Sequence, residues 1–511
     1  MNDAYAGVYR AFFLSTAVQV LNAGSSIQQN ISGSEYERRH LGYFGRVGYN
    51  YKEKYLAEFL WREDGSYIFP PNSRFGFFPG VSVGWRISEE GFFKNNVRFV
   101  DNLKFRASYG QVGAEPYLPG TTNLAEFQYL SSYNQGNIAF NGTVLPGLAE
   151  GVAPNNTFTW ERQKNLNFGL DGTVLNNKLN FTVDVFSNRR DKALLPPLGT
   201  VPATAIPGSQ LPPVNYGSLQ NRGWEFSVDY HNTTFGGLKY SIGANAGYAQ
   251  NKVLVFDEAP GVPDNQKQVG KPYQANVAFV YDGVFKDASE INGAMGTSSS
   301  GKQLDYSALV STLRPGDMKF KDISGPNGKP DGVIDHYDQE RLTKNTNFKM
   351  TYGITLNLQY KGFDASFLFQ GATGGLADIY TESGLIGNFL ASDYSHRWSI
   401  DNPSSVYPRL ADRANTYYTD RSSGGSGGHN TYNLKSTNYL RLKNLEIGYT
   451  LPSTITRKAA INTLRFYVNA TNLVTFSKMK DFDPEIYGGG NYLGQYYPQL
   501  RVISFGATVN F

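Results

Sequence analysis

The sequence predicts an all-β protein whose antiparallel strands form a transmembrane β-barrel. The first observation is composition: aromatic residues make up 14% of the 511 positions, 55 residues are glycine and none is cysteine, a balance that favours strands over helices. The second is an alternation of apolar and polar residues along much of the chain. The third is a repeated change between very short and very long polar connections.

The alternation defines the strands. In residues 103–109, the side chains of Leu103, Phe105, Ala107 and Tyr109 occupy every second position. Successive side chains of a strand point to opposite faces, so such a segment has one apolar and one polar face. The same pattern recurs in residues 224–231, 240–246, 352–360, 445–451 and 503–511. On this basis we expect roughly 14 to 16 strands.

A soluble β-sandwich gives the same alternation. The length of the strands and the residue types at their ends distinguish the two folds. Many of the predicted strands are ~10 residues long, which fits a tilted crossing of a bilayer. Aromatic residues gather at the strand ends, as in Tyr49, Tyr51, Tyr55, Phe59, Trp61, Tyr352 and Tyr360. Rings in these positions are typical of the girdles at the two membrane interfaces.

The connections also favour a membrane barrel. The segments "YNYKEKYL" (49–56), "LNNKLNF" (175–181) and "QYKGFDAS" (359–366) each predict a tight hairpin. Long polar connections are expected at about 114–158, 191–215, 251–345 and 371–437. Barrels of the outer membrane have short turns on one side and long loops on the other, whereas soluble β proteins have loops of a few residues throughout.

Charge and composition exclude several functions. The chain carries 47 Lys and Arg against 43 Asp and Glu, a formal net charge of +4, so no nucleic-acid partner is expected. The absence of cysteine excludes disulfides, thiolate metal sites and a cysteine nucleophile, and no apolar run is long enough for a membrane helix. The nearest paired acids, Glu89 with Glu90 and Asp481 with Asp483, are interpreted as solvated turn residues. We therefore expect no enzyme.

One segment resembles part of a calcium loop: "DISGPNGKPDGVIDHYD", residues 322–338. The acids at loop positions 5, 9 and 12 are Asp331, Asp335 and Asp338. Gly332 falls at position 6, where EF-hand loops need a glycine. Asp322 would supply a further oxygen if the inserted residues bulge out. Because Lys329 falls at a ligand position, the alternative of an Asp/Gly-rich turn without an ion is favoured, and no other cofactor is expected.

Aromatic residues in the long connections are candidates for stacking on sugar rings. They are Tyr281, Phe285, Tyr380, Tyr394, Trp398, Tyr407, Tyr417 and Tyr418. In a chain so rich in aromatic residues, packing within the loops or contact with a partner is the competing interpretation for each one.

The last strand has a direct consequence for assembly. Its apolar positions run from Ile503 to the terminal residue, Phe511, with no polar tail behind them. We expect Phe511 to be an assembly signal for the barrel-assembly machinery. The competing interpretation is the edge strand of a sandwich that ends there.

Seven blocks of sequence resemble the SusC/RagA type of TonB-dependent transporters. They are "WREDGSYIFPPNSRFGFFPGVSVGWRISEE" (61–90), "LKFRASYGQVG" (103–113), "TWERQKNLNFGLD" (159–171), "NYGSLQNRGWEFSVDY" (215–230), "RPGDMKFKDISGPNGKPDGVID" (314–335), "NYLRLKNLEIGYTLP" (438–452) and "LRFYVNATNLVTFSKMKDFDPE" (464–485). They appear in the order of the family and cover the chain from about residue 41 to its end.

The resemblance implies a fold, a location and partners. The fold is a ~22-stranded barrel of a class whose lumen is plugged, in the outer membrane of a Gram-negative bacterium. The implied partners are outer-membrane lipid, an energising TonB complex and a SusD-like surface lipoprotein. The implied substrates are oligosaccharides or peptides.

The start of the chain departs from the family. We expect residues 1–40 to be a partial strand and loop at a truncated start, and residues 41–511 to be the C-terminal part of the barrel without a plug domain. The alternatives are a passive porin or a surface glycan-binding barrel and, more distantly, a soluble lectin-like sandwich. Because open barrel edges leave backbone groups unpaired in lipid, the isolated chain is expected not to transport.

Overall fold

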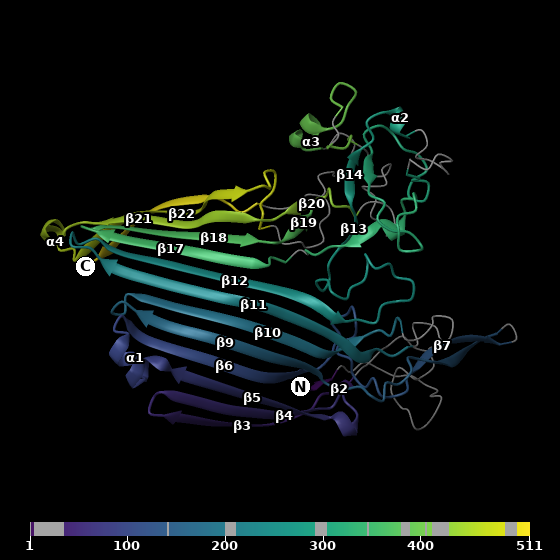
Figure 1. The fold of residues 1–511 in the computed structure, drawn as a ribbon, viewed down its shortest axis with the longest axis horizontal. Coiled ribbons are helices and arrows are strands. Elements are labelled where there is room, and N and C mark those ends of the chain that lie inside the picture. The colour runs from purple at the N-terminus through teal and green to yellow at the C-terminus, as the bar shows by residue number, and fades with distance from the viewer. Residues whose placement is uncertain are drawn as a thin grey trace.

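The computed structural model describes residues 2–4, 35–140, 143–199, 211–291, 304–344, 347–379, 389–403, 406–410, 429–485 and 498–511. Its main element there is one antiparallel sheet of 13 strands (Figure 1). In spatial order the strands are β3 (His40–Tyr51), β4 (Tyr55–Ser66), β5 (Phe75–Arg86), β6 (Val100–Ala114), β9 (Glu161–Val174), β10 (Leu179–Leu195), β11 (Val214–Thr233), β12 (Lys239–Val255), β17 (Met350–Tyr360), β18 (Phe363–Thr373), β21 (Tyr439–Thr450), β22 (Thr463–Ser477) and β23 (Val502–Asn510). The predicted antiparallel all-β fold is confirmed.

Among the described residues the main sheet has fewer strands than the 14 to 16 expected from a rough count of alternating segments. The remaining strands of the described residues lie outside the main sheet and pair only with one another. They are β1 (Asn2–Ala4), β2 (Glu35–Glu37), β7 (Tyr133–Phe140), β8 (Thr143–Glu150), β13 (Val277–Phe279), β14 (Tyr281–Val284), β15 (Met318–Phe320), β16 (Gln339–Arg341), β19 (Leu376–Asp378) and β20 (Leu434–Ser436). In the part of the chain described, the sheet is open, with β3 and β23 as its edges.

Short connections gather at one end of the sheet, called here the turn end. Lys361 and Gly362 link β17 to β18 with φ angles of 48° and 87°, as a two-residue hairpin that follows the strand twist requires. The longer links at this end contain short helices: η3 (Ile87–Glu89), α1 (Gly91–Asn96), α4 (Ser453–Thr456) and η7 (Arg457–Ala459). The C-terminus also lies at the turn end (Figure 1).

Long connections gather at the opposite end, called the loop end. They join β6 to β9, β10 to β11, β12 to β17 and β18 to β21. The described parts of the link from β22 to β23, residues 478–485 and 498–501, also lie there; this link was not among the predicted long connections. The helices of this end are η2 (Pro71–Ser73), α2 (Ala288–Ile291), η5 (His336–Asp338) and α3 (Ala391–His396). No helix among the described residues is long and apolar enough to span a membrane.

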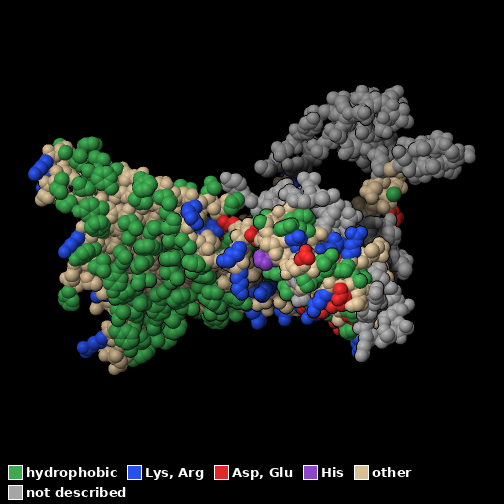
Figure 2. Space-filling view, turned by 90° about the horizontal axis from the view of Figure 1, so that it is seen from above, with side chains coloured by type: hydrophobic (Ala, Val, Ile, Leu, Met, Phe, Trp, Pro, Cys, Tyr) green, Lys and Arg blue, Asp and Glu red, His purple; other side chains and the backbone are tan. Residues whose placement is uncertain are grey.

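The two faces of the sheet differ in polarity. Figure 2 shows a broad band of hydrophobic side chains over the strands, with Lys and Arg side chains at its rims. We call this the outer face and the opposite, polar face the inner face. Both clusters of buried apolar residues in the described parts belong to the loop end: one is centred on Phe279 and Phe320, the other on Phe69 and Phe158. Most of each strand therefore forms a wall, and the packed cores of the described residues lie at the loop end, where Phe78 of β5 and Leu194 of β10 join the second one.

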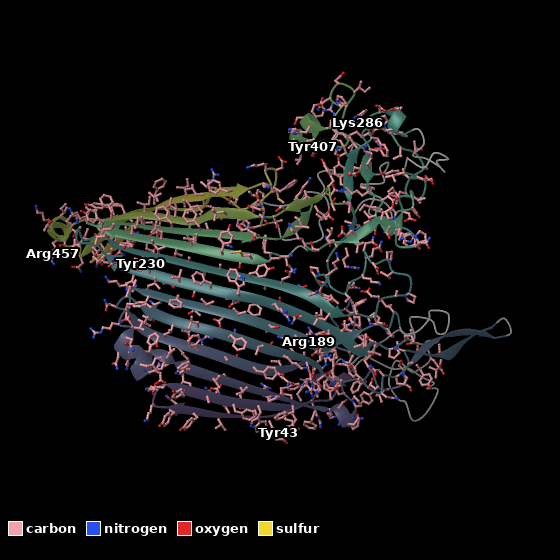
Figure 3. All side chains as sticks on the ribbon, viewed as in Figure 1. Tyr43, Arg189, Tyr230, Lys286, Tyr407 and Arg457 are labelled. Atoms are coloured by element: carbon pink, nitrogen blue, oxygen red, sulfur yellow. The ribbon has the colours of Figure 1, made fainter. Side chains whose placement is uncertain are left out.

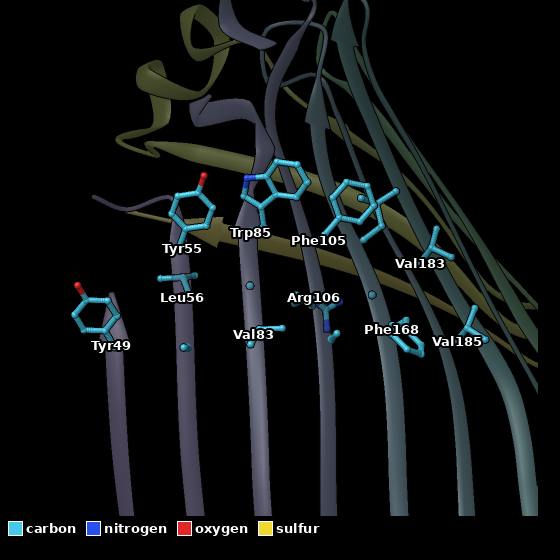
Figure 4. A pocket seen from close by; sticks show the side chains of 15 residues that line it. Tyr49, Tyr55, Leu56, Val83, Trp85, Phe105, Arg106, Phe168, Val183 and Val185 are labelled. Atoms are coloured by element: carbon cyan, nitrogen blue, oxygen red, sulfur yellow. The ribbon is translucent and has the colours of Figure 1, made fainter. Parts of the chain in front are cut away.

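An aromatic row marks the outer face near the turn end (Figure 4). Tyr55, Trp85 and Phe105 pair in register across β4, β5 and β6, and the rings of Trp85 and Phe105 stack 6.2 Å apart. With Phe168 and Val185 they line an apolar groove of about 580 Å³. Rings in this place fit the interfacial girdle that the sequence predicts.

Candidate functional site

A row of asparagines crosses the inner face near the loop end. This amide row consists of Asn165, Asn188, Asn221 and Asn251, one each from β9, β10, β11 and β12. Register places Asn188 opposite both Asn165 and Asn221. Asn221 in turn lies opposite Asn251. Neighbouring strands are about 4.8 Å apart, so the row presents closely spaced groups that can each donate and accept hydrogen bonds.

A cavity of about 750 Å³ lies over the amide row. Residues 117–122, from the connection after β6, form part of its wall, and Tyr273 contributes a second aromatic ring. Gln163 donates a hydrogen bond of 2.8 Å to Asn165. The side chains of Asn188 and Asn221, by contrast, make no hydrogen bond to another described residue. Unpaired amides facing a cavity of this size are available to a ligand.

The charges in this cavity neutralise each other. The buried carboxylate of Glu161 pairs with Arg190, and it also accepts a hydrogen bond of 2.9 Å from the Leu194 N–H. With that pair satisfied, the other polar side chains that line the cavity are uncharged amides and the hydroxyls of tyrosine and threonine. The site is therefore suited to a neutral, hydrogen-bonding ligand.

Two ion triads extend the polar inner face toward the turn end. Arg106 pairs with Asp171 at 2.8 Å and with Asp184 at 3.0 Å, which links β6, β9 and β10. Arg465 likewise pairs with Glu446 at 2.7 Å and with Asp364. Each triad holds one cation and two carboxylates. Such groups belong in a wet lumen and not against lipid.

A buried charge cluster lies at the loop end of β21. Arg441, with 1% of its side chain exposed, donates to Asp483 at 2.6 Å, to Glu485 and to Thr475 at 2.9 Å. Lys443 reaches Glu485 at 3.2 Å. The interpretation of Asp483 as a solvated turn acid is therefore wrong, because the segment after β22 folds back and buries it against Arg441.

Two long connections, residues 256–349 and 374–438, fold onto one another. Their described parts form what we call the loop module. Phe279 and Thr431 of the two connections are joined by a backbone hydrogen bond of 2.9 Å. Arg409 pairs with Asp317 at 2.7 Å, and burial raises the pKa of Asp317, an effect that Arg409 opposes.

The predicted loop aromatics divide between packing and exposure. Phe285 is buried in the loop module against Tyr306, and Tyr281 packs on Tyr432 at 5.0 Å. Trp398 donates from its ring to the Lys286 carbonyl at 3.1 Å. Tyr394 and Tyr407 are exposed, and Figure 3 shows Tyr407 at the top of the molecule. Tyr380, Tyr417 and Tyr418 lie outside the described residues.

The four acids of the calcium-like segment act as caps of the turn backbone. Asp338 is fully buried and accepts N–H donors from Ile323 at 2.8 Å and from Asp335 at 2.9 Å. Asp335 accepts from the Tyr337 N–H, Asp322 from the Gly332 N–H and Asp331 from the Val333 N–H. Burial raises the pKa of Asp338 to about 6. Gly332 has a φ of 84°, which a side chain would strain.

These contacts occupy carboxylate oxygens of all four acids with backbone N–H groups. No group of three His, Cys, Asp or Glu side chains within the described ranges is placed to hold a metal ion. Calcium binding by Asp331, Asp335, Asp338 and Asp322 stays a prediction, and the observed capping fits the alternative of an ion-free turn.

Phe511 follows directly after the edge strand β23. Its side chain is 84% exposed, and register pairs Val509 and Phe505 of the same face with β22. We predict that deleting Phe511 lowers the amount of folded protein in the outer membrane, because the assembly machinery loses the terminal aromatic residue. Heat-modifiable mobility on gels measures the folded fraction. Deleting the exposed Phe235, in the turn between β11 and β12, serves as a control, and an unchanged level without Phe511 would refute the role.

The sheet has an apolar outer face and a polar inner face, and its short turns are separated from its long connections. These features define a class of protein, the outer-membrane β-barrel, of which the sheet forms the wall. The family described as "TonB dependent receptor-like, beta-barrel" matches residues 3–473. The chain belongs to this TonB-dependent receptor family. Its members are receptors and transporters of the Gram-negative outer membrane, so the predicted location is confirmed, and the family is not one of enzymes.

Individual relatives support the same assignment. TonB-dependent receptor P3 of Formosa agariphila is 30% identical over 98% of this chain and 48% of that protein. TonB-dependent receptor SusC of Bacteroides thetaiotaomicron is 25% identical over 92% of this chain and 44% of that protein. The RagAB peptide importer in its "open-open" state shares the fold, with a TM-score of 0.68 and 21% identity over 97% of this chain and 50% of that chain. The predicted SusC/RagA resemblance is confirmed, and the chain spans about half the length of these relatives.

The sequence did not identify the amide row. The predicted alternation marked residues 224–231 and 240–246 within β11 and β12, and none of the four asparagines lies in these segments. Their alignment into a row also depends on strand register. The available signal was the predicted hairpin at 175–181, which has Asn165 and Asn188 at similar distances on its two sides. Asn251 was instead assigned to the predicted connection 251–345, because the extension of β12 to Val255 was not foreseen.

Proposed function

We propose that the chain forms part of the barrel wall of an importer. This importer carries oligosaccharides, or alternatively peptides, across the outer membrane. In this proposal a TonB complex supplies energy and a SusD-like lipoprotein covers the loop end. The likeness to SusC and to the RagAB peptide importer supports this function. The proposed substrate class rests mainly on the amide row and the cavity above it.

The chemistry of the cavity favours a neutral, hydroxyl-rich chain. Amides bond equally well to sugar hydroxyls and to peptide groups, so the amide row by itself accepts both. Tyr117 and Tyr273, which are 54% and 44% exposed, add flat rings to the wall. The Arg190–Glu161 pair leaves no free charge to recognise a peptide terminus. Oligosaccharide is therefore the first candidate.

Replacing Asn188 and Asn221 together by leucine tests this role. Each lost hydrogen bond weakens binding by about 0.5–1.5 kcal/mol, so the pair should lower substrate affinity by roughly 5- to 150-fold. Uptake of a labelled oligosaccharide across a concentration series measures the change.

The matched control is Asn245→Leu with Asn469→Leu, which removes two amides from the inner face outside the cavity. Its uptake should match that of the wild type at equal outer-membrane levels. Equal uptake by the Asn188/Asn221 variant would contradict the proposed binding role.

A further inference from the structure

Four cations lie together on the outer face at the loop end. They are Lys164 on β9, Arg189 on β10, Arg222 on β11 and Lys252 on β12. Residues two positions apart on a strand share a face. Lys164 therefore lies on the same face as the apolar Leu166 and Phe168, and Arg222 lies on the same face as Trp224. No register shift lies between these residues, so the alternation of faces is unbroken there. We call these four residues the outer basic row.

Register brings the four charges close together. Arg189 lies opposite Lys164 on β9 and opposite Gln220 on β11. Lys252 lies opposite the same Gln220. Arg222 is one step nearer the apolar band, opposite Ser187 and Gln250 on the two neighbouring strands. With strands about 4.8 Å apart, the row from Lys164 to Lys252 extends over roughly 14 Å.

The row carries a net positive charge. Its neighbouring acid is Asp191, which contacts Arg189 at 2.7 Å and Lys164 at 3.1 Å. The side chains of Lys164 and Arg189 nevertheless remain 45% and 50% exposed, and Arg222 and Lys252 are also exposed. Four cations against one carboxylate leave three positive charges pointing outward. Asp191 holds two of the cations in place without neutralising the row.

The position of the row indicates its ligand. Figure 3 shows Arg189 toward the loop end of the strands and Tyr230 at the turn end. In outer-membrane barrels the long connections face the cell exterior, so the outer basic row lies at the level of the outer-leaflet headgroups, directly beside the apolar band. Arginine forks and lysine charges both suit phosphate. Amides and hydroxyls between them, from Gln220, Gln250 and Ser187, add neutral hydrogen-bonding groups.

We propose that the outer basic row binds the phosphate groups of an anionic lipid in the outer leaflet. The lipid chains would lie along the apolar band of β9 to β12, and the headgroup phosphates would contact the cations. This interaction is independent of the transported substrate, because the row and the amide row lie on opposite faces of the same four strands.

The test uses the purified receptor, expressed from its natural gene. Lys164, Arg189 and Lys252 are replaced together by glutamine, which keeps length and polarity. Binding is measured by thermal shift and by lipid retained on the protein, with phosphatidylcholine vesicles containing bis-phosphorylated lipid A. Since each cation near an anionic surface contributes substantially to binding, the variant should bind roughly 100-fold more weakly. Wild-type binding should fall as salt increases.

The control variant removes the same number of charges from the turn end: Lys178, Lys239 and Arg457 to glutamine. It should bind like the wild type, and dephosphorylated lipid A should bind both proteins weakly. Unchanged binding by the loop-end variant would overturn the proposal. Equal stabilisation by inorganic phosphate alone would overturn the commitment to a lipid. Heat-modifiable mobility confirms that each variant is folded.

Discussion

Replacing Arg441 with leucine is expected to abolish the folded state of the segment after β22 and to lower the yield of folded barrel sharply. The guanidinium is 1% exposed and holds the carboxylates of Asp483 and Glu485. Without it, Lys443, at 3.2 Å from Glu485, is the one cation among the described residues that still pairs with these two largely buried carboxylates. Removing one partner of a buried charge pair costs about 3–5 kcal/mol, a large share of the stability of a typical domain.

Limited proteolysis and heat-modifiable mobility measure this effect. New cleavage should appear between residues 478 and 485 in the Arg441→Leu variant. Combining Arg441→Leu with Asp483→Asn and Glu485→Gln should restore much of the folded fraction, because removing a whole buried charge cluster is far less costly than breaking it. A single Arg441→Leu variant with wild-type protease resistance would show that the cluster is not required for folding.

The fold was predictable because the membrane forces a simple pattern on the strands. Lipid requires an apolar side chain at every second position, so β17 and β21 could be located from residues such as Ile354 and Ile447 alone. Tight turns were equally clear, as at Lys361 and Gly362. The short strands of the long connections were not predictable in this way, because β13 to β16 are stabilised by contacts within the loop module and not by a membrane-facing pattern.

The site was less predictable because it depends on contacts between distant residues. Arg441 and Asp483 are far apart in sequence, and only the fold-back of the segment after β22 brings them together. The amide row likewise needs four strands in one register. In the calcium-like turn, the sequence showed acidic residues and a glycine at spacings suited to an ion. It did not show that Asp338 and Asp335 accept hydrogen bonds from the turn backbone as caps.

Energy dependence has the largest expected effect on function. If the chain is the wall of a TonB-dependent importer, substrate bound at the loop end crosses the membrane only when energy reaches the barrel. Collapse of the proton gradient should therefore stop uptake and leave surface binding in place. The Asn188/Asn221 variant should instead bind substrate more weakly at the cell surface, while the energy supply to the barrel stays intact.

The most direct measurement is the uptake of a labelled oligosaccharide by cells that express the protein from its natural gene, with and without a protonophore. For a TonB-dependent importer, uptake should fall to background when the gradient is collapsed, while the label remains bound at the cell surface. Uptake that continues at the same rate without the gradient would contradict it and would identify the protein as a passive porin.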